Sequence, residues 1–180
     1  MKNKYTMAMV PESLAGFNAY DDENGNLLIG QTGEMTIATL TAITNEVQGA
    51  GIAGAYSAVS AGNFQAISQE IPFKAMIPQI AKYMNPMRRN AISVRGLMQI
   101  LDRTTGIRDR VPFRFMVSGV GTAISPGTMQ TGNPMGTTLT MDVTHILFVV
   151  GGETLFEIDK LNMVCIIDGE DILADVRKYC

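Results

Sequence analysis

The chain has 180 residues, of which 46% are hydrophobic and 17% are charged, and its formal net charge is −3 at pH 7. This length suits a single domain over residues 1–180, and two cysteines and one histidine are too few for a disulfide framework or a metal site rich in these residues. No run of 18 apolar residues occurs and the N-terminus has no apolar signal-peptide core, so we expect neither membrane insertion nor export by a signal peptide.

The charged residues are sorted into a basic middle and an acidic end. Between 88 and 114 there are seven arginines and two aspartates, whereas from 142 onward eight acidic residues accompany three basic ones. Complementary patches on different faces favour head-to-tail contacts between copies; ion pairs within one subunit or solvated charges are the alternative. The candidate subunit contacts are Arg88, Arg89, Arg103, Arg108, Arg110, Glu157, Asp159 and Asp171.

The first half of the chain predicts an N-terminal arm over 1–16 and two strands over 34–47 and 63–73. Both strands mix threonine, glutamine and serine with β-branched residues, so neither has a cleanly apolar face. Such strands suit a wall that packs on one side and meets water on the other. Residues 74–84 then predict a helix, in which Pro78 is tolerated only near the first turn.

Between these two strands, residues 48–62 form a stretch rich in glycine and alanine that contains G-x-G-x-x-G at Gly49, Gly51 and Gly54. This spacing binds a dinucleotide only between a strand and a helix, with an acidic residue about 20 positions later. The segment that follows has no apolar helical stripe, and the flanks read as strands. We therefore expect an inter-strand loop, continued by Tyr56, rather than a nucleotide site.

The second half alternates apolar and polar residues with period two. It predicts strands over 91–101 and 111–119 joined by the turn DRTTGIRDR, an irregular loop over 120–137, and a strand over 138–150. In that last strand Leu139, Met141, Val143, His145 and Leu147 share one face. Gly151-Gly152 predicts a tight hairpin turn into a strand over 153–163, and 169–178 predicts a short helix.

No arrangement of residues predicts catalysis or a cofactor. The sequence has no Walker loop, HExxH, CxxC or GxSxG pattern, and His145 lies in phase with an apolar strand face, where a core or interface histidine is expected. We therefore expect a non-enzymatic assembly protein without cofactors. A small-ligand-binding β-barrel and an enzyme that uses a pair of carboxylates are the alternatives.

The C-terminal stretch LFEIDKLNMVCIIDGEDILADVRK resembles the end of the major tail tube protein of contractile-tailed bacteriophages and phage-tail-like bacteriocins. The matching residues are Glu157, Ile158, Asp159, Asn162, Met163, Gly169, Asp171, Leu173 and Arg177. Upstream, GAGIAG followed by NFQAISQEIPF is similar to the R-G-A-G-x-x-G loop and strand of this family, with Gln48 where arginine is expected. The resemblance covers residues 17–180.

The resemblance implies a mainly antiparallel β-sandwich or partial barrel with one flanking helix and a short C-terminal helix, which closes into a hexameric ring. Rings would stack into a tube with a sheath, baseplate or initiator and tape-measure proteins as partners, in a virion tail or extracellular bacteriocin particle assembled in the bacterial cytoplasm. The tube would conduct DNA or dissipate an ion gradient; a tube of a type VI-like secretion system is the alternative.

Within such a tube, the mixed-polarity strands become the candidate wall of the lumen. Thr36, Thr44, Gln65 and Gln69 are the residues expected on the wet side, where their neutrality would keep DNA from adhering. The connecting residues Gly49, Gly51, Gly54 and Tyr56 become candidate contacts between rings or subunits. Glycine suits that position because it permits close backbone approach and positive φ.

Overall fold

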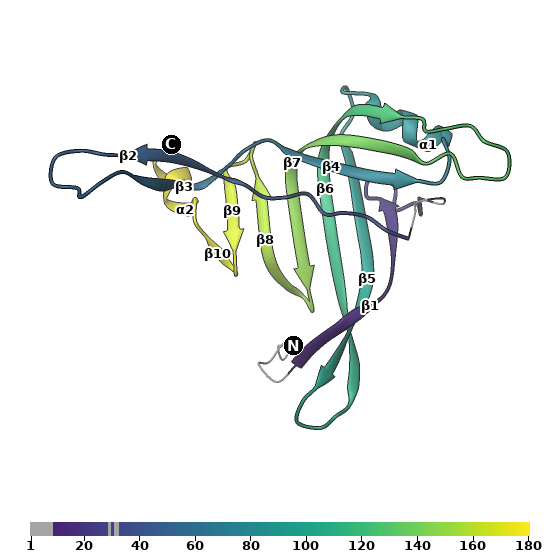
Figure 1. The fold of residues 1–180 in the computed structure, drawn as a ribbon, viewed down its shortest axis with the longest axis horizontal. Coiled ribbons are helices and arrows are strands. Elements are labelled where there is room, and N and C mark those ends of the chain that lie inside the picture. Colours follow the sequence, from purple (N-terminus) through teal and green to yellow (C-terminus); the bar gives the residue numbers. More distant parts are fainter. Residues whose placement is uncertain (1–8, 29, 31–32) are drawn as a thin grey trace.

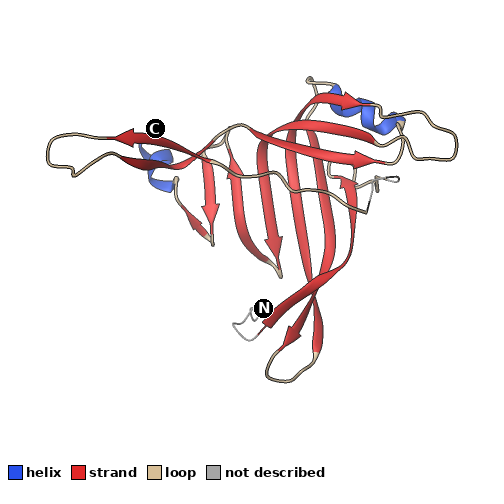
Figure 2. Cartoon of the chain, viewed as in Figure 1, coloured by secondary structure: helices blue, strands red, loops and turns tan. Residues whose placement is uncertain are grey.

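A computed structural model describes residues 9–28, 30 and 33–180. Of the chain, 56% is strand and 8% is helix, which confirms a mainly β, antiparallel fold (Figure 2). None of the described helices is long and apolar enough to span a bilayer.

An eight-stranded antiparallel sheet forms the body of the molecule (Figure 1). Its continuous path runs β1-β5-β6-β7-β8-β9-β10, and β4 pairs separately with β7. The sheet does not close on itself in the subunit. The strands are β1 (Met9–Asp21), β4 (Ile67–Phe73), β5 (Asn90–Asp102), β6 (Arg108–Ser125), β7 (Thr137–Val150), β8 (Glu153–Asp159), β9 (Val164–Ile167) and β10 (Glu170–Asp171).

The predicted hairpin of β5 and β6 is confirmed, because both strands alternate apolar and polar residues as the sequence indicates. Ile92, Val94 and Ile100 of β5 lie on the buried face, together with alternate residues of β6 such as Phe115 and Val117. Strand β6 runs on to Ser125, so the irregular loop predicted over 120–137 is confined to 126–136. The N-terminal arm predicted over 1–16 is likewise ordered as β1 from Met9 onward, and its first eight residues lie outside the described part.

Strand β7 contains a bulge that the alternation of the sequence does not reveal. Ser118 pairs with His145 and Gly119 with Val143, so Thr144 is an extra residue in β7. The extra residue reverses the phase of the strand: the buried face changes from Leu139, Met141 and Val143 to Ile146 and Val150. The prediction that His145 shares the apolar face is therefore wrong.

The same bulge lies where the sheet forks. On the side of β7 away from β6, residues 137–143 pair with β4 and residues 145–150 pair with β8. Thr144 belongs to neither ladder; its carbonyl accepts a hydrogen bond from Lys160 N at 2.9 Å. Gly151 and Gly152 then form the predicted two-residue turn, both with positive φ (62° and 91°). The strand predicted over 153–163 ends at Asp159, because residues 160–163 turn back into β9.

A separate two-stranded sheet, β2 (Ala42–Val47) with β3 (Tyr56–Phe64), extends away from the body (Figure 1). The strand predicted over 34–47 is thus paired only from Ala42, and 34–41 is extended chain without a ladder. The strand predicted over 63–73 is divided between the end of β3 and β4. The loop predicted over 48–62 is short, covering 48–55, since Tyr56 already begins β3.

Helices are short and lie at the margins of the sheet (Figure 2). The helix predicted over 74–84 is reduced to α1 (Pro78–Ala81) and the 3₁₀ helix η1 (Lys82–Met84), because Pro78 occupies the first turn. Ile80 and Tyr83 are buried and close one end of the core. The predicted C-terminal helix is α2 (Ala174–Tyr179).

Candidate functional site

The β2–β3 arm, residues 42–64, presents an apolar and almost uncharged surface. Ile43, Tyr56 and Val59 are 38%, 55% and 64% exposed, although such side chains are normally buried in a folded subunit. The arm carries one charged residue, Glu46. Thr44, a predicted lumen residue, is exposed on β2 opposite Val59. An exposed apolar two-stranded arm is a surface suited to contact with another chain.

The tip of the arm contains the positive φ angles that its glycines were predicted to permit. Gly51 and Gly54 have φ of 90° and 112°, a region that other L-residues rarely adopt. Gly49 has no such φ, and a Cβ added at any of these three glycines would meet nothing within 4 Å among the described atoms. Within the subunit, therefore, conformation explains Gly51 and Gly54, and neither conformation nor crowding explains Gly49.

The base of the arm is held by the C-terminal segment. Leu173, just before α2, lies so close to Gly62 that a Cβ there would come within 2.6 Å of the leucine side chain. Lys160 Nζ donates a hydrogen bond to the carbonyl of Gln65 at 2.7 Å, immediately beyond β3. Arg177 of α2 binds the carbonyl of Met163 and the carboxylate of Asp171. These contacts tie the arm to the part of the chain that carries the C-terminal sequence motif.

The four predicted lumen residues do not share one environment. Thr36, Thr44 and Gln65 are exposed, but Gln69 is fully buried, so its prediction as a wet residue is wrong. Gln69 is on the core face of β4, where its amide bridges two segments: Oε1 accepts from Ala38 N at 2.9 Å and Nε2 donates to Thr36 O at 2.7 Å. These two hydrogen bonds attach the segment 34–41, which forms no strand ladder, to β4.

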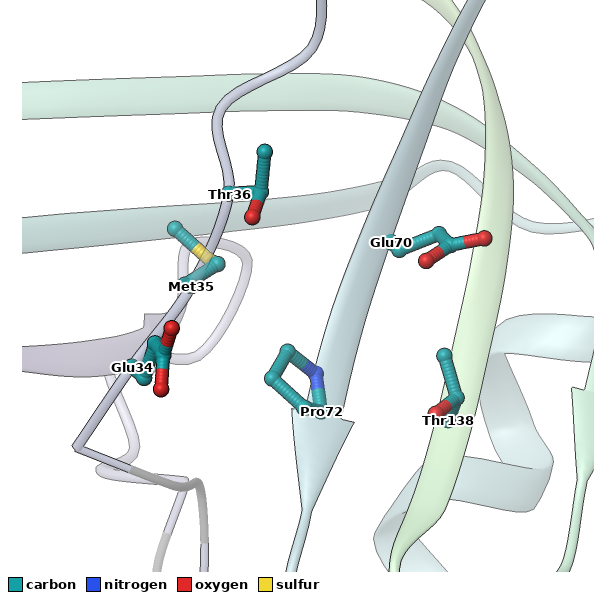
Figure 3. A pocket seen from close by; sticks show the side chains of 6 residues that line it. All are labelled: Glu34, Met35, Thr36, Glu70, Pro72 and Thr138. Carbon is teal, nitrogen blue, oxygen red and sulfur yellow. The ribbon is translucent and has the colours of Figure 1, made fainter.

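Thr36 lines a shallow hollow between this extended segment and the sheet. Figure 3 shows Glu34, Met35 and Thr36 on one side, with Glu70 and Pro72 of β4 and Thr138 of β7 opposite. The hollow has a volume of about 320 Å³ and both acidic and apolar walls. Among the described residues no group of histidine, cysteine or acidic side chains could hold a metal ion, here or elsewhere.

Several predicted contact charges already have partners within the subunit. Arg108 Nε binds Glu12 Oε2 at 3.0 Å, and Asp171 binds Arg177. The hydrogen bond from Gln99, followed by that from Arg108, lowers the pKa of Glu12. For these residues the structure shows the alternative that the sequence left open, namely ion pairs within one subunit.

The two acidic residues at the end of β8 are engaged in the same way. Glu157 Oε1 is 3.0 Å from Nε2 of His145, which lies on the face of β7 opposite the core and has an 18% exposed side chain. Asp159 accepts hydrogen bonds from the backbone of Leu161 and Asn162 and from the Asn162 side chain, at 2.6–3.1 Å. Burial tends to raise the pKa of Asp159, but these hydrogen bonds outweigh it and hold the pKa below its usual value.

The structure separates the predicted arginines into two groups at opposite ends of the sheet. Arg88 and Arg89 precede β5 and line a hollow of about 360 Å³ that also contains Asp159. Arg103, Arg108 and Arg110 lie at the turn between β5 and β6, at the other end of both strands. The basic middle of the sequence is therefore not one patch.

Sequence reasoning missed two features of the structure. Asp21, the last residue of β1, is buried and forms an ion pair with Lys82 of η1. Met87 is 91% exposed in the short connection before β5. Neither lies in a periodic segment, so only its place in the fold distinguishes it.

These features define a mainly β-protein whose open sheet and apolar arm are suited to assembly. Residues 11–179 match the family model of the phage tail tube protein FII. The chain belongs to this family and is a tail tube protein, which confirms the family resemblance seen in the sequence. No curated protein matches the chain.

Among solved structures, the chain is similar to a chain of the anti-feeding prophage (AFP) baseplate, determined by cryo-EM and 6-fold symmetrised. The two are 12% identical, and the match covers 81% of this chain and 97% of the other, with a TM-score of 0.45.

Proposed function

We propose that copies of this protein form hexameric rings that stack into the inner tube of a contractile tail. The observation that carries this proposal is the β2–β3 arm. It pairs with no strand of the main sheet and exposes Ile43, Tyr56 and Val59. An isolated two-stranded hairpin is only marginally stable in water, so further strands or an apolar surface of neighbouring copies would complete it.

The composition of the arm suits the wall of a conduit. Residues 42–64 include no lysine or arginine, and phosphate binding to a protein increases with each such contact. Thr44, together with the exposed Thr36 and Gln65, supplies neutral polar groups to the inner surface. DNA could then pass without adhering, or ions could flow through the tube after sheath contraction in a bacteriocin particle.

The remaining partners follow from the same proposal. A sheath would surround the tube, a baseplate or initiator would mark the end from which it grows, and a tape-measure protein would set its length. The particle would be a virion tail or an extracellular bacteriocin assembled in the bacterial cytoplasm. The sequence resemblance to tail tubes of contractile phages supports this version over a tube of a type VI-like secretion system.

Negative-stain electron microscopy of the purified chain at high concentration tests the proposal. We expect tubes with an axial hole and six-fold symmetry in end views. Replacing two apolar arm residues, Tyr56→Ser with Val59→Ser, should prevent tube formation while the subunit keeps its melting temperature. Exchange of two exposed apolar side chains away from the arm, Ile107→Ser with Met129→Ser, is the matched control. A monodisperse monomer under all conditions, or monomers that bind a small ligand, would refute the proposal.

A further inference from the structure

The connection between η1 and β5, residues 85–89, forms a projection that we call the Met87 knob. Met87 at its tip is 91% exposed, a larger fraction than any other exposed large apolar residue of the described chain. Arg88 and Arg89 follow it directly, and both are exposed. Both line the hollow that contains Asp159, but among the described residues neither guanidinium forms an ion pair with a carboxylate. The knob thus combines an apolar tip with two unpaired positive charges.

The backbone of the knob is held in place by three hydrogen bonds, of which the one from Asn90 to the Tyr83 carbonyl is buried. Asn90, which is 4% exposed, donates from Nδ2 to the carbonyls of Tyr83 at 3.0 Å and Asn85 at 3.1 Å. Asn85 Oδ1 in turn accepts from the backbone N–H of Met87 at 3.0 Å. A contact made by a rigid segment loses little conformational entropy on binding. The exposure of Met87 is therefore a property of a fixed loop.

A hollow of complementary character lies on β8 and β9. It has a volume of about 550 Å³, and its lining includes the apolar Leu155 and Ile166 and the acidic Glu153 and Asp168. Leu155 is 44% exposed, and the two acidic residues are exposed without an ion pair in the described part of the chain. A lining that combines apolar side chains with two carboxylates complements an apolar tip with two arginines beside it.

The knob and the hollow lie at opposite ends of the same sheet. Strand β5 begins at Asn90, next to the knob, and is antiparallel to β6, which is antiparallel to β7. β7 therefore ends far from the knob, at the Gly151-Gly152 turn, and β8 begins there with Glu153. β9 is antiparallel to β8 and returns to that end at Asp168 (Figure 1). One subunit cannot join the two, but copies stacked along the strands can.

We infer that the Met87 knob of one copy docks into the hollow beside Glu153 and Asp168 of a second copy in the adjacent ring. This inference rests on the proposed tube and names the contact by which its rings stack. Met87 covers Leu155 and Ile166, while Arg88 and Arg89 pair with the two carboxylates. A contact between different surfaces of identical copies extends into a filament when its rotation does not close a ring, as in stacking along the strands.

Charge exchange across the contact tests this inference. The variant R88E/R89E should give rings or monomers in place of tubes, and E153R/D168R should do the same, because each brings like charges together. Combining all four substitutions restores opposite charges and should restore tubes to near wild-type length. A matched control, K74E/K178E, changes the net charge as much as R88E/R89E but lies elsewhere, and it should leave tube length unchanged.

Met87→Ser tests the apolar part of the contact and should shorten the tubes at equal protein concentration. Circular dichroism and melting temperature of each monomer establish that every variant folds. Wild-type tubes together with unchanged R88E/R89E tubes, or a four-fold variant that fails to restore assembly, would overturn the inference. A wild-type chain that never forms tubes would instead refute the proposed function, so the two failures are distinguishable.

Discussion

Leu173 packs against Gly62 so closely that a Cβ at residue 62 would lie 2.6 Å from both Cγ and Cδ2 of the leucine. Gly62 also has a φ of 74°, which L-residues other than glycine adopt only with strain. The contact joins β3 of the arm to the segment before α2, although 110 residues separate the two positions in the sequence.

Gly62→Ala should loosen the base of the arm. The backbone strain alone costs about 1–2 kcal/mol, and displacement of Leu173 adds to it. We expect faster hydrogen exchange across 42–64 with a smaller change in the main sheet. Adding Leu173→Ala should relieve the clash but leave the strain, so the double variant should lose less stability than the sum of the two single variants. Strict additivity would show that the two residues do not interact.

Substitutions at two further glycines, Gly119 and Gly49, distinguish crowding within the subunit from contacts between copies in the tube. A Cβ at Gly119, beside the β7 bulge, would lie 1.9 Å from the carbonyl oxygen of Asp142, so Gly119→Ala should cost about 3 kcal/mol. The added Cβ of Gly49→Ala meets no described atom within 4 Å, so the unfolding free energy of the monomer should stay unchanged. If Gly49 contacts a neighbouring copy, that substitution should still impair tube formation. Urea unfolding and electron microscopy measure the two effects separately.

Asp21 should contribute to the dependence of stability on pH. Burial raises the pKa of its carboxyl, but Lys82 and Asn24 outweigh this effect and hold the pKa below its usual value. A lowered pKa in the folded state means that the ion pair stabilises the fold above the unfolded pKa, about 3.9, and that this stability is lost as the pH falls through the folded value.

Asp21→Asn should therefore lower the unfolding free energy at pH 7 by about 1.5–3 kcal/mol and flatten its decline in acid. Denaturant titrations between pH 7 and pH 3 measure both effects. Glu46→Gln, which removes an exposed carboxylate on the arm, serves as the control and should reproduce the wild-type curve. An Asp21→Asn curve parallel to that of the wild type would contradict the role assigned to the ion pair.

Hydrogen exchange should also change on assembly. The tip residues 48–55 are exposed and lie outside the β2–β3 ladder, and that ladder is separate from the main sheet, so amides of the arm should exchange faster in the monomer than those of the main sheet. Protection of Gly49 to Gly62 should rise sharply in tubes. Equal exchange in the two states would show that the arm does not contact neighbouring copies.

The sequence predicted those parts of the fold whose local signal is strong. The alternation in 91–101 and 111–119 and the Gly151-Gly152 turn define their hairpins because side-chain period and backbone conformation are local properties. Thr144 could not be recognised as a bulge, since nothing in its neighbourhood marks an extra residue. Only the register between β6 and β7 reveals the bulge. The residues of β7 after Thr144, including His145, therefore lie on the face opposite to the predicted one.

The candidate site was predicted less well, because exposure depends on packing between distant segments. Gln69 is a polar residue of the kind expected to face water. It is buried instead, because its amide forms hydrogen bonds with the backbone of the extended segment 34–41. The sorted charges of the sequence predict ion pairs but do not identify the partner of each residue. Arg108 contacts Glu12, 96 positions away, whereas Arg88 and Arg89 have no carboxylate partner among the described residues. The family resemblance succeeded because its motif in 157–177 is local.

The fork at Thr144 also determines how the subunit would carry mechanical load. β7 is joined to β6 along almost its whole length, while on its other side β4 holds the first half and β8 the second. A force along the strands is thus resisted by many hydrogen bonds in shear, which must break together. A force that separates β4 from β8 would meet no ladder at Thr144. The sheet is strong along the axis proposed for stacking and compliant across the fork, so bending of a tube would concentrate there.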